Sequence, residues 1–390
     1  METGTKSVKP TRADELADAI ASAARSSERL AIRGGGSKDD IGRPVRAAAV
    51  LDMTGFAGVI DYDPPELVLT VGAATPLCEV DALLASRGQA LAFEPFDHGP
   101  IFGRAPGAAT IGGVIAAGVA GPRRLSQGAA RDHLLGFEAV SGRGERFVGG
   151  GKVVKNVTGY DLPKLMTGSW GRLAALTQVT LKVLPRAPMQ LTKLVAGLEI
   201  PAALRLMAKA MGSKAEVKAA AHIPWSAKHD GRSVTALLLA GFPASLEARG
   251  RMIDALIDTQ ERLEPMEDAE CAAFWHDMAV AASLGRARPL WRISVPASRA
   301  AMIGEALQLA PQDQLFDWAG GLVWIAYEGD AVRMRAAAEA AGGQAMLVRA
   351  PTAMRENVPA LHPRLPGVAA LEERVRRAFD PLGIFETGRF

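Results

Sequence analysis

The sequence predicts an α+β fold in which helices and strands alternate along the chain without a regular strand–helix–strand repeat. Short apolar, β-branched runs alternate with patterns of helical period from one end to the other. The segment Pro185-Arg-Ala-Pro188 interrupts this alternation and marks a domain boundary. Beyond it, strands and helices follow each other as in a smaller antiparallel sheet covered by helices.

The composition restricts the class of protein. With 390 residues, of which 48% are apolar and 22% charged, the chain is long enough for two or three globular domains. Lys and Arg number 45 against 42 Asp and Glu and form no basic block, so we expect no nucleic-acid partner. The two cysteines, Cys78 and Cys271, lie outside any CxxC motif, so we expect no iron–sulfur cluster and no metal site in this chain.

The same features predict a cytoplasmic protein without a transmembrane segment. Residues 1–10 lack the apolar core of a signal peptide. The longest apolar stretch, near residues 111–120, is interrupted by glycines and is too short to cross a bilayer. The low cysteine content suits a reducing compartment.

Helices in the first half are expected from their end signals. Thr11 is the expected N-cap of one helix, with Asp14 at the capping-box position. Thr75-Pro76 opens a second helix and Gly88 closes it. Asp161 can cap a short helix that ends at Gly168. The strands expected here are residues 30–33, 47–53, 66–71, 134–140, 145–148 and 173–183, with turns at residues 63–66 and 142–144.

The second half shows the same alternation up to a Pro-rich stretch that starts at Pro351. The strands expected here are residues 191–198, 233–242, 290–295 and 321–326. The expected helices are residues 202–211, 244–263, 299–309 and 331–341, with a last one near 371–379.

Three loops of small residues distinguish the first half. The central one, residues 105–118, has too many glycines for a stable helix and too little alternation for a strand. Small residues let another molecule approach the backbone, and amides in such a loop can converge on an anion. The other loops are Arg33-Gly-Gly-Gly-Ser-Lys38 and residues 155–162 with the following Gly168-Ser-Trp-Gly171. We expect the three together to bind one large phosphate-bearing cofactor.

Neither of two common nucleotide-binding motifs explains these loops. The dinucleotide fingerprint G-x-G-x-x-G fits Gly34 and Gly36, but Asp39 occupies its third glycine position. The P-loop G-x-x-x-x-G-K-[ST] is absent. Taken alone, the first loop could be a tight turn after a strand and the second a close contact between helices. Their combination favours an anion site.

The order of five motifs resembles a known flavoprotein family. R-G-G-G-S-K, A-T-I-G-G-V-I-A-A-G, R-D-H-L-L-G, K-N-V-T-G-Y-D-L and T-L-K-V-L-P follow one another between residues 30 and 186. This order resembles the FAD-binding half of the vanillyl-alcohol-oxidase (PCMH-type) flavoproteins. Residues 290–296, 317–321 and 379–385 further resemble the FAD-binding (E) subunits of bacterial glycolate oxidases. The resemblance implies a two-lobed PCMH-type FAD-binding domain (1–186), an α+β cap or interaction domain (187–350) and a segment returning to the FAD domain (351–390).

The resemblance also implies the cofactor site. FAD would be non-covalent, because covalent relatives carry a histidine in the first loop where Ser37 stands. Lys155, Asn156 and Tyr160 would brace the lobe. The residues expected near FAD are Arg33, Gly34, Gly35, Gly36, Ser37, Lys38, Thr110, Gly112 and Gly113 through backbone amides at the diphosphate and ribityl, Leu176 and Thr177 at the adenine, and Pro95 and Asp97 at the isoalloxazine.

Two family features are missing. Relatives that oxidise 2-hydroxy acids carry an H-x-G-D-G-N-x-H type motif, and none of the six histidines forms such a pair, so catalytic residues stay unassigned. His98, near the expected flavin loop, is the one acid–base candidate. The family usually ends in N-P-G-R, whereas Glu386-Thr-Gly-Arg389 stands here, which leaves a flavin contact of the tail open.

The resemblance implies the FAD-binding subunit of a complex that oxidises glycolate, a 2-hydroxy acid, to glyoxylate. Electrons would leave through a separate iron–sulfur subunit, and a sister flavin subunit would hold the main substrate-oxidising site. Such a complex is cytoplasmic, or peripheral at the inner membrane through partner subunits. Two alternatives are a self-sufficient FAD-dependent dehydrogenase of another small hydroxy acid or alcohol, and a non-catalytic flavin-fold assembly subunit. The intact glycine loops argue against the last.

Overall fold

The computed structural model describes residues 6–152, 159–257 and 262–390, and its first unit is a small parallel sheet. Strands β1 (Lys6–Val8), β3 (Ala49–Asp52) and β2 (Leu30–Arg33) lie in the order β1-β3-β2. Helix α1 (Ala13–Ser26) buries Leu16, Ile20 and Ala23 against them. Its N-cap is Arg12 rather than the predicted Thr11. Glu15, whose side chain is longer than that of the predicted Asp14, accepts hydrogen bonds from the backbone amides of both Thr11 and Arg12.

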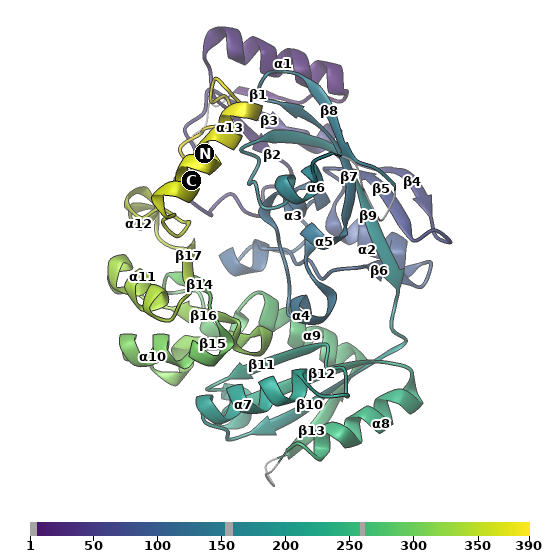
Figure 1. Ribbon diagram of the computed structural model, residues 1–390, viewed down its shortest axis with the longest axis vertical. Helices are drawn as coiled ribbons and strands as arrows, with labels where there is room; N and C mark the ends of the chain where they lie inside the picture. The colour runs from purple at the N-terminus through teal and green to yellow at the C-terminus, as the bar shows by residue number, and fades with distance from the viewer. Residues whose placement is uncertain (1–5, 153–158, 258–261) are drawn as a thin grey trace.

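A second, six-stranded sheet forms the other lobe of the first half (Figure 1). The long strand β9 (Ala174–Pro185) lies between β5 (Val68–Gly72) and β7 (Leu134–Ser141). The outer strands are β4 (Val59–Asp63), β8 (Arg146–Gly150) and β6 (Gln89–Leu91), which pairs with β9. Strand β4 was not predicted; it is an edge strand whose Val59 and Ile60 side chains are exposed. Helices α2 (Leu77–Ala85) and α6 (Leu162–Met166) belong to the same lobe.

The glycine-rich stretch contains a helix, contrary to the prediction. Helix α3 (Ile111–Ala117) starts after Thr110, whose hydroxyl accepts a hydrogen bond from the Gly113 amide. A β-carbon on Gly112 would lie 2.6 Å from the Ala73 carbonyl oxygen. The helix therefore forms despite its glycines because it is capped, and because the glycine lets it pack directly on the strand end beside it.

The second half of the chain forms an eight-stranded antiparallel sheet (Figure 1). Helices α7 (Ile200–Met211), α8 (Pro243–Asp254), α10 (Ala301–Leu307) and α11 (Ala331–Ala340) pack on one face. The helix predicted for residues 244–263 was too long, since α8 ends at Asp254 and residues 262 and 263 begin a strand. The strand order is β13 (Arg262–Glu267), β10 (Met189–Ala196), β12 (Val234–Gly241), β11 (Ala219–Ile223), β15 (Gln314–Asp317), β16 (Leu322–Ala326), β14 (Leu290–Ser294) and β17 (Gln344–Arg349).

The other face of this sheet packs toward the first half. Side chains alternate along β14, so Trp291 and Ile293 join the helix-covered core while Leu290 joins a second core. That second core also contains Trp324 of the sheet, Val119 of the first half, and Trp275 of α9 (Asp268–Ala279). The two halves are thus held together by a shared apolar core.

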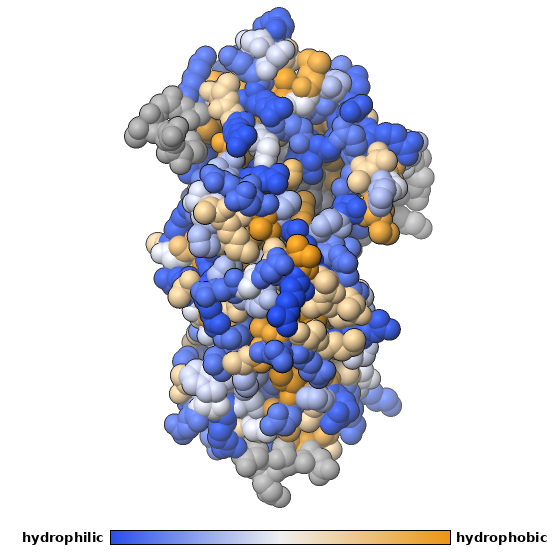
Figure 2. Space-filling model, turned by 90° about the vertical axis from the view of Figure 1, so that its left-hand side faces the viewer, coloured by the Kyte–Doolittle hydropathy of each residue, from blue (hydrophilic) through white to orange (hydrophobic). Residues whose placement is uncertain are grey.

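The C-terminal residues return to the first half. After α12 (Thr352–Asn357) and α13 (Pro366–Phe379), the Leu30 amide donates to the Ile384 carbonyl at 2.8 Å. Phe379 packs on Phe147 of β8, with ring centroids 5.6 Å apart. The face that carries α11 and α13 is mostly hydrophilic with small apolar areas between (Figure 2). No helix in the described ranges is long and apolar enough to cross a membrane.

Candidate cofactor site

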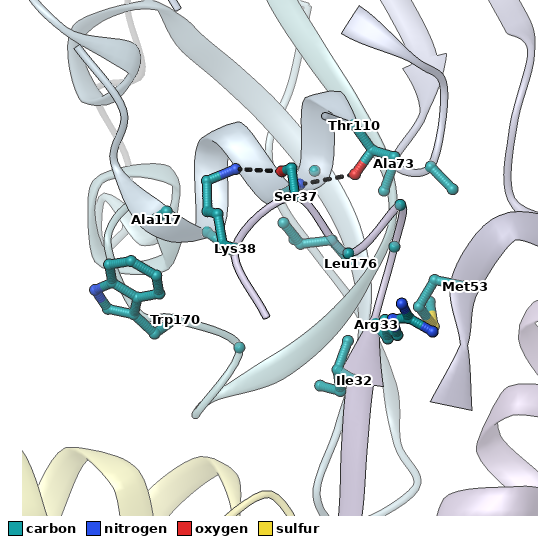
Figure 3. A pocket seen from close by; sticks show the side chains of 18 of the residues that line it. Ile32, Arg33, Ser37, Lys38, Met53, Ala73, Thr110, Ala117, Trp170 and Leu176 are labelled. Atoms are coloured by element: carbon teal, nitrogen blue, oxygen red, sulfur yellow. Dashed lines mark hydrogen bonds between the residues drawn. The ribbon is translucent and has the colours of Figure 1, made fainter. Parts of the chain in front are cut away.

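The first loop, the second loop and residues 170–171 of the third loop meet at one cleft of about 790 Å³, part of which is open to solvent. In Figure 3, Lys38, Ala117 and Trp170 lie on one side of the cleft, Ile32, Arg33 and Met53 on the other, and Leu176 between them. The lining residues are Ile32, Arg33, Gly34, Gly35, Gly36, Ser37, Lys38, Asp39, Met53, Ala73, Ala74, Thr110, Gly112, Gly113, Ala116, Ala117, Trp170, Gly171, Ala174, Leu176 and Arg389.

The first loop supplies free backbone donors. Among the described residues, the amides of residues 34–38 donate to no acceptor. Gly36 has φ +80°, which only glycine adopts without strain, and it turns the chain so that consecutive amides can face the same side. A β-carbon on Gly35 would lie 1.9 Å from the Ala108 carbonyl oxygen, so glycine is required for the first loop to touch the second.

In the second loop, three of the four amides of residues 110–113 already have acceptors within the protein, whereas the Thr110 amide donates to no acceptor among the described residues. The Ile111 amide donates to the Thr75 carbonyl, the Gly112 amide to the Ala73 carbonyl, and the Gly113 amide to the Thr110 hydroxyl. Thr110 is therefore the residue of the second loop whose amide stays available for the predicted diphosphate, while Gly112 lets the wall of the cleft pack closely on Ala73.

The third loop closes the cleft at the end of α3. The Gly168 amide donates to the Ile115 carbonyl at 3.0 Å, and the Trp170 amide to the Ala116 carbonyl at 2.7 Å. The Trp170 ring packs on Phe390, with centroids 4.8 Å apart. Lys155 and Asn156, expected to brace this lobe, lie outside the described residues, and Tyr160 is exposed.

Lys38 places a buried amine at the cleft. Its Nζ lies 3.3 Å from the Ser37 hydroxyl, and it forms no ion pair with a described carboxylate. Burial lowers the pKa of Lys38 to about 8; the Asp97 charge opposes this and the Arg389 charge adds to it. A negative group bound in the cleft would compensate the cost of burying this charge.

The C-terminal Arg389 also lines the cleft, which answers the question left by the altered tail. Its guanidinium donates to the Ile41 carbonyl at 2.7 Å and to the Lys38 carbonyl. The Arg43 amide in turn donates to the Arg389 carbonyl at 3.0 Å. The arginine that ends the atypical tail was the only signal in the sequence for this contact.

Three predicted residues, Asp97, Thr177 and Pro95, are absent from the lining of this cleft. The Asp97 carboxylate accepts hydrogen bonds from the amides of Gly99, Gly107 and Ala109, so it shapes the chain that leads into the second loop. Thr177 donates to the Glu138 carbonyl, on the opposite side of β9 from Leu176. Pro95 is likewise absent from the lining.

The sequence analysis did not assign the apolar part of the lining. Met53 follows β3, Ala73 and Ala74 follow β5, and Ala174 begins β9. These small or flexible side chains carry no chemical motif, so only the fold brings them to the cleft.

The residues present fit FAD. Unpaired amides and a buried amine suit a diphosphate, while apolar and small residues around them leave room for flat rings. The free amides of residues 34–38 are the observation that carries this fit. Within the described ranges no cluster of three or more His, Cys, Asp and Glu could hold a metal.

Comparisons with known proteins agree with this geometry. Residues 6–149 match the family described as FAD binding domain. Glycolate oxidase subunit GlcE of Escherichia coli (strain K12) is 33% identical over 362 residues, which are 92% of this chain and 92% of that protein. D-lactate dehydrogenase of Archaeoglobus fulgidus is 32% identical over 181 residues, or 46% of this chain and 38% of that protein.

A solved structure extends the likeness to the whole fold. Alkyldihydroxyacetonephosphate synthase matches 97% of this chain and 76% of its own with a TM-score of 0.69, at 12% identity. This likeness concerns the fold alone. The full-length similarity to the Escherichia coli subunit is the stronger finding: the chain belongs to the GlcE family of FAD-binding oxidoreductase subunits, within the PCMH-type flavoproteins.

Proposed function

We propose that this chain is the FAD-binding subunit of a complex that oxidises glycolate to glyoxylate. The observation that carries the proposal is the cleft in which free amides of residues 34–38 and the buried Lys38 amine meet apolar walls. The similarity to a glycolate oxidase subunit over 92% of both chains supports the choice of substrate. D-lactate dehydrogenase is another relative, which supports 2-hydroxy acids as the broader substrate class.

FAD, when bound, would supply a two-electron acceptor for the electrons that leave the alcohol carbon of the substrate within the complex. The amides of residues 34–38 would hold its diphosphate, and Lys38 would neutralise part of the charge. Leu176 and Trp170 would exclude water from its rings. No described residue of the cleft is a histidine that could bond covalently to a flavin, which supports non-covalent binding.

Electrons would leave through a separate iron–sulfur subunit. Cys78 is exposed on α2, and Cys271 is buried with its sulfur hydrogen-bonded to Thr192 and Met266, so two such cysteines cannot hold a cluster. A sister flavin subunit would hold the main substrate-oxidising site. We place the chain in the cytoplasm, or at the inner membrane through its partners. We assign residues 1–186 to the FAD domain, 187–350 to the cap domain and 351–390 to the returning segment.

Anaerobic flavin reduction tests the proposal. The purified chain is loaded with FAD, glycolate is added, and the flavin absorbance is followed before and after addition of the sister and iron–sulfur subunits. We expect little bleaching of the isolated chain and full bleaching in the assembled complex. D-lactate serves as a second substrate.

Two outcomes would contradict the proposal. Rapid bleaching by glycolate in the isolated chain would identify a self-sufficient dehydrogenase. A chain that takes up no FAD at any concentration, but still assembles with its partners, would identify a non-catalytic assembly subunit.

A further inference from the structure

A second polar cluster lies where the eight-stranded sheet packs on the first half of the chain, outside the lining of the cofactor cleft. We call Arg292, Trp318, Arg124 and His98 the junction cluster. Arg292 pairs in register with Trp324 on the face of the sheet that shares a core with the first half. Trp318 follows β15, and its indole donates to the Gly121 carbonyl at 2.9 Å. The cluster thus joins both halves of the chain.

Arg292 is a half-buried charge without an acceptor. Among the described residues it has no hydrogen bond and no carboxylate within 4.0 Å, and its nearest recorded contacts are the rings of Trp318 and Trp324. Burial lowers the pKa of Arg292 to about 10, and the neighbouring Arg124 charge adds to this, while Asp317 opposes it. A buried guanidinium normally binds a carboxylate or phosphate, so its free donors indicate a missing anion.

Arg124 brings a second positive charge to the same ring. The guanidinium carbons of Arg124 and Arg292 lie 5.0 Å and 4.8 Å from the centroid of Trp318. Arg124 likewise has no ion pair with a described carboxylate. Two cations that gather on one indole repel each other unless an anion lies with them. Arg124 also lines a hollow that shares Ala117 with the cofactor cleft.

The backbone around Trp318 is strained in a way that fixes this arrangement. Trp318 and Ala319 have φ values of 51° and 53°, in the left-handed region that is unfavourable for residues other than glycine. Backbone strain of this kind collects at functional sites. This backbone conformation directs the Trp318 indole toward the loop that follows α3, where it donates to the Gly121 carbonyl.

Within the junction cluster, His98 is the member that feels the charge of Lys38, a residue of the cofactor cleft, as well as that of Arg292. Its side chain is 8% exposed, stacks on Phe96 with centroids 4.5 Å apart, and its buried Nδ1 has no partner among the described residues. Burial lowers the pKa of His98 well below its ordinary value, and the charges of Lys38 and Arg292 both add to this. The imidazole is therefore neutral and close to both cations.

We infer that the junction cluster binds the carboxylate of a small organic acid, with Arg292 as the anchoring group and Arg124 as a second positive charge at the opening. The choice of a 2-hydroxy or 2-oxo acid rests on the proposed function. The free donors of Arg292 would form two parallel hydrogen bonds with the carboxylate, and Trp318 would hold the guanidinium plane in place. Asp317 and Glu94 lie nearby, but burial raises the pKa of both carboxyls, which reduces their repulsion of a bound anion.

Oxalate, a non-oxidisable analogue, tests this inference with the FAD-loaded full chain. Binding is followed by calorimetry and by the change in the flavin spectrum at fixed ionic strength. We expect Arg292→Gln to weaken oxalate binding by about a hundredfold, Arg292→Lys and Arg124→Gln by about tenfold, each with unchanged FAD content. Arg251→Gln is the matched control, because Arg251 lies on the exposed side of α8 and, within the described ranges, forms an ion pair with Glu247 alone.

Each further result decides for or against the site. Oxalate bound by Arg292→Gln as tightly as by the unmodified chain would overturn the inference, as would no oxalate binding by the unmodified chain. Inorganic phosphate that binds as tightly as oxalate would overturn the carboxylate assignment. Loss of FAD in Arg292→Gln would place this residue in the cofactor site instead. If Arg292→Gln does not fold, the test uses Arg124→Gln, in which an exposed residue is changed. Unweakened oxalate binding by that variant would then overturn the inference. The proposed function fails separately, when the complete complex is not reduced by glycolate.

Discussion

The Arg389 guanidinium donates a hydrogen bond to the carbonyl oxygen of Lys38. The second-last residue of the chain thereby holds the first glycine loop, more than three hundred positions away in the sequence. The same guanidinium binds the Ile41 carbonyl at 2.7 Å. Because the amides of residues 34–38 belong to that loop, the shape of the cofactor cleft depends on the C-terminal tail.

Arg389→Ala should therefore weaken FAD binding and lower stability together. Hydrogen bonds from a charged donor contribute about 1.5–3 kcal/mol each, so we expect at least a tenfold rise in the Kd for FAD. Fluorescence titration and urea unfolding measure the two effects. Arg377→Ala is the control, since Arg377 is exposed and pairs only with Glu373 on its own helix. An Arg389→Ala chain that binds FAD as tightly as this control would show that the tail does not shape the cleft.

Gly35→Ala should destabilise the protein and abolish FAD binding. The added β-carbon would lie 1.9 Å from the Ala108 carbonyl oxygen, which is backbone and cannot move aside alone. We expect a loss of at least about 3 kcal/mol in the free energy of unfolding, as for overpacking of a rigid site. Gly367→Ala is the matched control, because nothing lies within 4 Å of its β-carbon position. Equal melting temperatures for the two variants would be incompatible with direct packing of the first two loops.

FAD affinity should decline above about pH 8. Burial lowers the pKa of Lys38 to about 8 in the free protein, and a bound diphosphate would favour the charged amine and raise that pKa. Affinity is therefore constant below this pH and falls as pH rises through it, by at most about tenfold per pH unit. FAD titrations between pH 6.5 and 9.5 would measure the decline.

Two substitutions at Lys38 separate its charge from other effects. Lys38→Gln should bind FAD more weakly at neutral pH and lose the decline, whereas Lys38→Arg should keep its affinity at high pH. A Lys38→Gln profile parallel to that of the unmodified chain would assign the pH dependence to another group.

Asp317 should make the protein less stable as pH rises from about 4 to about 7. Burial raises the pKa of Asp317 to about 7, although the Trp318 amide opposes this; the Glu94 charge adds to the rise and Arg292 opposes it. At pH values between the ordinary pKa of an aspartate and the raised pKa of Asp317, the folded protein binds more protons than the unfolded chain. The stability that Asp317 contributes is therefore present at low pH and is lost as the pH rises. Urea unfolding at pH 5 and pH 7.5 measures the difference. Asp317→Asn should reduce it, and an unchanged difference would contradict the buried, proton-binding state of this carboxyl.

Local signals in the sequence were sufficient for most elements of regular structure. Asp161 caps α6 by accepting from the Lys164 amide, as its position predicts, and the runs that became β2, β9 and β12 are apolar and β-branched along their length. The prediction that residues 105–118 form no helix was wrong. The cap at Thr110 and the contact of Gly112 with Ala73 outweigh the low helix propensity of glycine, so helix α3 forms. Tertiary contacts decide such cases, and propensity does not record them.

The family and the small-residue loops could be recognised from the sequence alone, because those loops need glycine at fixed positions and the order of their motifs is specific. The tertiary structure decided which groups are available for binding. The fold uses the amides of Gly112 and Gly113 within the protein, sets the Asp97 carboxylate against amides of the second loop, and adds Arg389 to the wall of the cleft. It also placed Arg292 beside Trp318 without an anion. Whether a donor is free depends on which distant acceptor lies within about 3 Å of it, and only the folded chain sets that distance.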